Sequence, residues 1–183
     1  PYGYGQLDGS FQIDTHLMLS LYRQFLGEEG MLLSEAFEYH LLRLESTGVH
    51  YKNIAAQKVI FCEGAAAIQN PYFPVDCLLP KKGEYITVKA SGLNIRAIIK
   101  GPYFIIPLGN DFYKIGATFA HGDVSPETTK QGTEILVQAA EKIIASDFTV
   151  VDQVAGFRPT VKDRRPLLGL HPNHSAMVFF NGL

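Results

Sequence analysis

The chain has 183 residues, of which 46% are hydrophobic and 19% are charged, a composition typical of a folded mixed domain rather than a disordered or coiled protein. Its 16 basic and 18 acidic residues give a net charge of −2, which offers no electrostatic reason to expect binding to nucleic acid or an anionic membrane. No apolar run approaches the roughly 20 residues that span a bilayer, so a small molecule or a protein is the expected partner.

The first regular element is predicted to be a helix over residues 15–26. One apolar stripe with a spacing of four residues runs along it: Ile13, Leu17, Leu21 and Phe25. Asp14 stands in the N-cap position, and Gly27 is expected to end the helix.

Short extended stretches follow the helix. Residues 38–45 and 49–56 are joined by a turn at 46–48, whose glycine can take a positive φ, and this pattern predicts a meander. The apolar run 58–64 then predicts a strand covered on both faces, as in a parallel sheet. Cys62 lies inside this run and is expected to be a buried thiol.

The middle of the chain predicts an antiparallel sheet with one helix. Its expected strands are residues 84–89, 97–108 and 112–119, with a turn at 109–111. Ser125 and Pro126 are expected to begin an amphipathic helix that ends near Ser146.

The chain then returns to a strand at 149–155, followed by a segment rich in proline and charge at 160–174 that is expected to be a loop. A last strand is predicted at 177–180. The order of elements indicates two interleaved domains, one α/β and one α+β.

Arg158 is the first candidate for a functional side chain. It lies between Gly156-Phe157 and Pro159, so its backbone is constrained while its planar guanidinium can hold a carboxylate with two parallel hydrogen bonds. The alternative is a structural salt bridge at a sheet edge. Tyr103 and Phe104 are adjacent in a strand, so one ring can line a pocket while the other packs in the core; in the alternative, both pack.

Other side chains give weaker signals. The six histidines are scattered, and only His171 and His174 have a metal-like spacing, so no metal is assigned. The charged loop around Asp163 is expected to be solvated and self-paired.

Two cysteines are too few for a disulfide framework, which favours a reducing cytoplasm. The sequence contains no G-x-G-x-x-G, so it lacks the usual glycine cradle for a dinucleotide.

Four segments in order resemble the D-amino acid oxidase-like family of FAD-dependent oxidoreductases, which includes D-amino acid oxidase, glycine and sarcosine oxidases and D-amino acid dehydrogenases. The segments are Val59–Ala65, Tyr103–Pro107 followed by Lys114–Thr118, Gly156–Pro159 with Asp163, Pro166 and Gly169–Pro172, and Phe180–Gly182. The resemblance covers nearly the whole chain. It implies part of a Rossmann-like FAD-binding domain interleaved with an antiparallel-sheet substrate-binding domain.

The resemblance also implies domain boundaries and site residues. Residues 8–76 and 157–183 would belong to the FAD-binding domain, and 77–156 to the substrate-binding domain. Arg158 would bind the substrate carboxylate beside the flavin. Phe104 falls where several members have a substrate-contacting tyrosine, a role that Tyr103 would have to fill here. The cofactor-binding residues implied are Glu63, Gly64, Ala65, Asn181 and Gly182.

The activity implied is hydride transfer from the α-carbon of a small amine or amino acid to FAD. Both ends of the chain are interpreted as cuts within a longer protein, and the chain alone is expected to be inactive and to bind FAD weakly or not at all. Two alternatives stay open: a tRNA wobble-uridine-modifying enzyme of the same superfamily, for which the net charge is unfavourable, and a binding module that has lost flavin. The residues do not define the substrate or distinguish an oxidase from a dehydrogenase.

Overall fold

The first compact unit contains one helix. The computed structural model describes residues 3–74, 76–121 and 125–182, and contacts divide the chain after Glu38 into two units. Helix α1 spans Thr15–Glu28, and the Asp14 carboxylate accepts a hydrogen bond from the Leu17 amide at 3.0 Å, which confirms the predicted N-cap. The predicted stop at Gly27 is wrong, because the left-handed residue after the helix is Gly30, at φ 66°. None of the α1 residues is buried.

The second unit begins with the predicted meander. A 3₁₀ turn and three short antiparallel strands make up this part: η1 (Tyr39–Leu41), β1 (Leu42–Leu44), β2 (Val49–Tyr51) and β3 (Ile54–Ala56). The hairpin glycine serves a close approach rather than a positive φ, since a Cβ on Gly48 would lie 2.4 Å from the Ala56 carbonyl oxygen.

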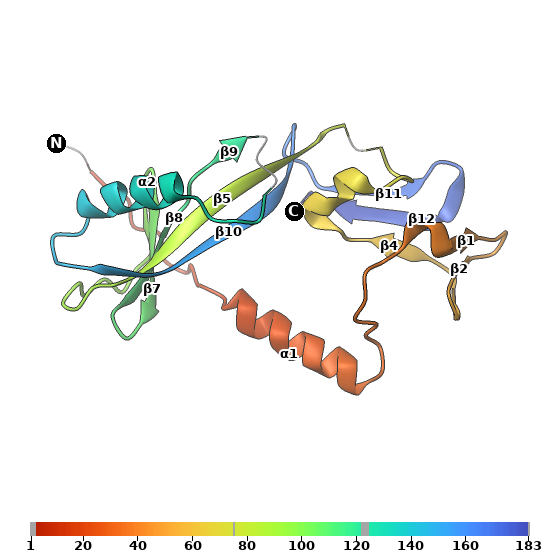
Figure 1. Ribbon diagram of the computed structural model, residues 1–183, viewed down its shortest axis with the longest axis horizontal. Coiled ribbons are helices and arrows are strands. Elements are labelled where there is room, and N and C mark those ends of the chain that lie inside the picture. The colour runs from red at the N-terminus through yellow and green to blue at the C-terminus, as the bar shows by residue number, and fades with distance from the viewer. Residues whose placement is uncertain (1–2, 75, 122–124, 183) are drawn as a thin grey trace. The chain divides into compact units, whose positions relative to one another are not determined.

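A second small sheet combines distant parts of the sequence (Figure 1). Its strands are β4 (Val59–Phe61), β11 (Leu167–His171) and β12 (His174–Asn181), and the 3₁₀ helix η2 (Gly64–Gln69) follows β4. The parallel pairing predicted for β4 is confirmed by its register with β12. Burial on both faces is not, because Ile60 is 58% exposed. Cys62 is exposed rather than buried, since it lies beyond the last residue of this short strand.

The largest sheet formed by the described residues is antiparallel, as predicted, but has six strands rather than the three expected, in the order β10-β5-β8-β7-β6, with β9 beside β5. The single strand expected at 97–108 is two strands, Ile99–Lys100 and Phe104–Gly109. The strands are β5 (Leu78–Lys89), β6 (Ile99–Lys100), β7 (Phe104–Gly109), β8 (Phe112–Gly116), β9 (Ala120–His121) and β10 (Thr149–Val161). Helix α2 (Lys130–Glu141) lies along one face (Figure 1). Its N-cap is Thr129 rather than Ser125, and it ends before Ser146.

The long strand β10 crosses two boundaries predicted from the sequence, the start of a loop and the end of a domain. The expected loop at 160–174 was wrong in part, because β10 extends to Val161 and β11 occupies Leu167–His171. The domain boundary predicted after residue 156 falls inside β10.

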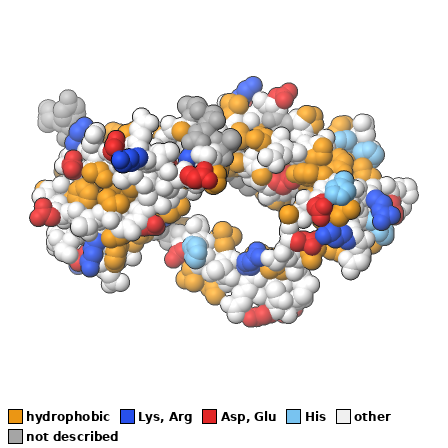
Figure 2. Space-filling model, in the orientation of Figure 1, with side chains coloured by type: hydrophobic (Ala, Val, Ile, Leu, Met, Phe, Trp, Pro, Cys, Tyr) orange, Lys and Arg blue, Asp and Glu red, His pale blue; other side chains and the backbone are white. Residues whose placement is uncertain are grey.

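Two hydrophobic clusters stabilise the second unit, and strand β5 contributes buried residues to both. Leu78 and Val161 pack in the cluster that contains Phe61 and Met177, whereas Ile86 packs in the cluster under α2. In the part of the chain that the structure describes, no helix is long and apolar enough to cross a membrane. Figure 2 shows hydrophobic side chains also exposed on the surface, interspersed with charges of both signs.

Candidate functional site

The register of the six-stranded sheet separates its two faces. Residues directly opposite each other in paired strands share a face, and alternate residues along a strand point to opposite faces. Ile86, Ile115 and Ile105 are opposite one another on three adjacent strands, are fully buried, and pack with Leu136 of α2. The other face carries the residues that alternate with them.

We call this second face the Arg158 face. Its members follow from the strand pairings, in which Arg158 is opposite Lys81, Gly156 is opposite Gly83, and Gly116 is opposite both Tyr85 and Phe104. Of the two adjacent aromatics, Tyr103 packs against the cluster under α2, and Phe104 lies on the Arg158 face; that Phe104 lines a pocket stays a prediction.

Arg158 is exposed on this face. Its guanidinium carbon lies 5.3 Å from the centroid of the Phe119 ring, and Phe119 is itself 62% exposed. No ion pair joins the guanidinium to any residue in the described ranges. The structural salt bridge that was the alternative for Arg158 is therefore not present in that part of the chain, and the guanidinium is accessible to a ligand.

Gly156 leaves open backbone between Arg158 and the aromatic residues, because a Cβ on it would meet no atom within 4 Å. Its partner Gly83 is covered, since a Cβ there would lie 3.1 Å from the Thr118 carbonyl oxygen. Beyond them Tyr85 packs over Gly116, where an added Cβ would lie 2.7 Å from the Tyr85 Cβ. A cation at one end, a backbone floor and an aromatic wall suit a small molecule with one anionic group.

Tyr85 was missed by the sequence analysis. It shares the Arg158 face with Phe104, whose ring would lie 3.0 Å from the same added Cβ on Gly116. The Lys114 ammonium lies 4.3 Å from the Tyr85 ring centroid. Period-two alternation in β5 separates Tyr85 from Ile86, but only the strand register shows that Tyr85 shares a face with Arg158.

The five predicted cofactor-binding residues lie together at a different place. They lie at the carboxyl ends of the parallel strands β4 and β12, the edge where ligands bind in open α/β sheets. The Asn181 side-chain amide donates to the Gly64 carbonyl at 2.8 Å, and its oxygen accepts from the Gly182 amide at 2.8 Å. Asn181 is buried and joins the two strand ends.

The backbone at this edge fits a group that approaches closely. Gly64 has φ 57°, and a Cβ added to it would meet no atom within 4 Å, so its backbone is open on that side. Ala65 adds only a methyl group at the start of η2. Gly182 has φ 77° and no room for a side chain, because a Cβ would lie 2.5 Å from a Val161 methyl.

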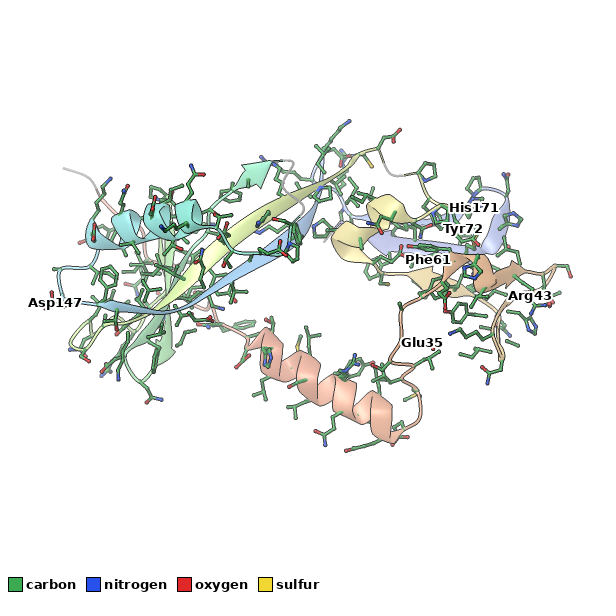
Figure 3. The ribbon with its side chains drawn as sticks, viewed as in Figure 1. Glu35, Arg43, Phe61, Tyr72, Asp147 and His171 are labelled. Atoms are coloured by element: carbon green, nitrogen blue, oxygen red, sulfur yellow. The ribbon has the colours of Figure 1, made fainter. Side chains whose placement is uncertain are left out.

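The Glu63 carboxylate is already engaged in the fold. It accepts hydrogen bonds from the Tyr39 hydroxyl and, at 2.7 Å, from the Asn70 side chain. Burial, followed by this hydrogen bond and the charge of Glu63, raises the pKa of Tyr39 to about 12. Tyr39 also packs near Phe61 and Tyr72, which Figure 3 labels beside β12.

The remaining charged and cavity features lie elsewhere. Asp163 accepts a hydrogen bond from the Arg165 amide at 3.1 Å, so the predicted self-pairing of this exposed loop is confirmed. The rings of His171 and His174 are 5.3 Å apart, but no group of three potential metal ligands occurs among the described residues. A surface cavity of about 610 Å³ lies beside Asp147, labelled in Figure 3, and contains no residue of the Arg158 face.

The candidate site thus has two parts, the edge at the carboxyl ends of the parallel strands β4 and β12 and the separate antiparallel sheet that exposes Arg158. The sequence model of the family described as FAD dependent oxidoreductase, DAO, matches residues 6–183. The chain belongs to this family.

Similarity to individual proteins agrees with that assignment. Glycine oxidase of Bacillus subtilis (strain 168) is 25% identical, in a match that covers 100% of this chain and 53% of that protein. The crystal structure of iminodiacetate oxidase from Chelativorans sp. BNC1 has a TM-score of 0.64 at 26% identity, over 78% of this chain and 42% of that one. Glycine oxidase from Geobacillus kaustophilus has a TM-score of 0.64 at 25% identity, over 77% and 41%. The chain thus spans about half the length of these proteins.

Proposed function

We propose that this chain is part of a longer FAD-dependent enzyme that oxidises a small amine or amino acid, with Arg158 as the residue that holds the substrate carboxylate. The observation that carries the proposal is the exposed guanidinium of Arg158 on the same sheet face as Phe104 and Tyr85. The similarity to glycine and iminodiacetate oxidases supports the reaction class.

Each residue has a distinct task in this proposal. Arg158 binds the carboxylate with two parallel hydrogen bonds and so restricts rotation of the substrate. Gly156 leaves space for the α-carbon and amine. Phe104 and Tyr85 cover the distal side and exclude water from the reacting carbon.

The cofactor would be held by backbone groups at Gly64, Ala65 and Gly182, with Asn181 fixing the two strand ends and Glu63 supporting η2 through Asn70. When bound, FAD supplies the hydride acceptor, and the oxidised substrate is an imine that water converts to a carbonyl compound and an amine or ammonia. We expect the 183-residue chain alone to retain little FAD, because its sequence has no G-x-G-x-x-G cradle.

The test is the visible spectrum of the full-length protein under anaerobic conditions. Glycine, sarcosine and a panel of D-amino acids are added one at a time, and the proposal predicts loss of the flavin absorbance with at least one of them. A full-length protein that binds no flavin, or a bound flavin that no amine in the panel reduces, would contradict the proposed function.

A further inference from the structure

Arg158 has a second cation directly opposite it. Lys81 on β5 is the register partner of Arg158 on β10, so both side chains leave the same face with Cβ atoms about 5 Å apart. Like charges directly opposite each other destabilise a sheet pair. The fold therefore maintains an unfavourable cation pair at the same place as the proposed carboxylate site.

Acidic side chains of the described residues do not neutralise this pair. No ion pair involving either Lys81 or Arg158 is found in the described ranges. Asp152, which is opposite Thr87, is the acidic residue of β10 on this face. It stands six residues from Arg158, a separation of about 20 Å along an extended strand. On the neighbouring strands, the groups between these positions are glycine, aromatic or aliphatic. The ionisable residues nearby, Lys114 on β8 and His121 opposite Lys81 on β9, are not acidic and cannot neutralise the pair.

A single carboxylate is poorly matched to pairing with both Arg158 and Lys81 at once. The guanidinium fork of Arg158 matches the two oxygens of a single carboxylate, whereas a lysine ammonium is a compact point charge on a flexible stem. Lys81 is half-buried and opposite Arg158, and Gly156, two residues before Arg158 on the same face, leaves open space beside the pair. An anionic group a few bonds away from the first carboxylate can reach Lys81.

We propose that Lys81 binds a second acidic group of the substrate, and that the preferred substrates of the enzyme are therefore amines with two carboxylates. This inference rests on the proposed function and adds the substrate class. Lys81 is a specificity-determining residue: it selects for charge, while Arg158 fixes orientation.

The test uses the full-length holoenzyme and substrate pairs that differ by one carboxyl group. Sarcosine is compared with iminodiacetate, and D-alanine with D-aspartate, in the wild type and in Lys81→Met, which retains the side-chain length. Lys89→Met is the matched control, because Lys89 lies on the same strand and the same face but eight residues away. KM and kcat are measured separately.

We expect the wild-type protein to have the higher kcat/KM for the dicarboxylic member of at least one pair. Lys81→Met should raise KM for that member by about tenfold or more, with a several-fold smaller change for its monocarboxylic partner, because only the former loses a charge partner. Lys89→Met should change neither. Equal losses for both members of each pair, or no loss in Lys81→Met, would overturn the role of Lys81.

A ligand that does not react separates this inference from the proposed function. Acetate and malonate also differ by one carboxyl group, and their binding is followed by the shift they cause in the flavin spectrum. Tighter binding of malonate in the wild type, reduced to the level of acetate in Lys81→Met, supports the role of Lys81 even if no amine reduces the flavin. Equal binding of the two anions by the wild type refutes it even if an amine does.

Discussion

Glu84→Gln is predicted to lower the free energy of unfolding by about 1–4 kcal/mol. The Glu84 carboxylate is 4% exposed and lies on the α2 face of β5. It accepts hydrogen bonds from the Thr129 amide at 2.8 Å, the Thr129 hydroxyl at 2.8 Å and the Gln153 side chain at 2.7 Å. The same carboxylate stands at the N-terminus of α2, where the helix dipole favours a negative charge.

The magnitude follows from the groups left without a partner. A glutamine presents one acceptor oxygen where the carboxylate presents two, so its NH₂ group faces a buried donor. Gln153 cannot turn its oxygen toward position 84 without losing the bond that this oxygen accepts from Thr133 at 2.5 Å. One buried donor without an acceptor costs about 1–3 kcal/mol, and loss of the charge at the helix end costs about 0.3–1 kcal/mol.

Equilibrium urea unfolding followed by far-ultraviolet circular dichroism measures this difference. Glu134→Gln is the matched control, because Glu134 is exposed on the same helix and its replacement should change the unfolding free energy by less than about 0.5 kcal/mol. If Glu84→Gln is as stable as that control, the capping role assigned to the buried carboxylate is refuted.

Two further replacements test local packing and titration. Gly132→Ala should destabilise the protein even though alanine is the better helix former, because the new Cβ would lie 2.5 Å from a Glu84 carboxylate oxygen; Gly27→Ala in α1, with no atom within 4 Å, should instead increase helicity. Thermal unfolding and circular dichroism distinguish these signs, and a stabilised Gly132→Ala would show that the contact is wrong. The Tyr39 pKa rises from 10.0 to about 12, so the stability contributed by the neutral hydroxyl is full below pH 10 and is lost as the pH rises through 12. Tyr39→Phe should lose less stability than the wild type between about pH 10 and pH 12, whereas equal losses would argue against the hydrogen bond to Glu63.

Much of the fold could be predicted from local patterns. The α1 cap at Asp14, the meander, the antiparallel sheet and the turn at 109–111 all follow from short-range periodicity and turn residues. The start of α2 could not be predicted this way, because its N-cap Thr129 is held by hydrogen bonds to Glu84, which is 45 residues earlier in the chain. Strand β11 was missed because its pairing with β12, rather than its composition, makes it extended.

Part of the candidate site could be predicted from the sequence. Arg158 was singled out by its residue type and its constrained neighbours, and the register adds which side chains share its face. Tyr85 and Lys81 could not be assigned to that face until β5 was aligned with β8 and β10. The exposure of Cys62 likewise depends on where β4 ends, which an apolar run of seven residues does not reveal.

The central claim is that the Arg158 guanidinium binds the substrate carboxylate, and kcat/KM of the full-length enzyme with its best amine substrate tests it most directly. Arg158→Ala should lower kcat/KM by roughly 30-fold to 5,000-fold, which corresponds to about 2–5 kcal/mol of transition-state stabilisation. Arg165→Ala, which removes an arginine from an exposed loop, should leave kcat/KM within about twofold of the wild type. An Arg158→Ala enzyme with wild-type kcat/KM would contradict the account.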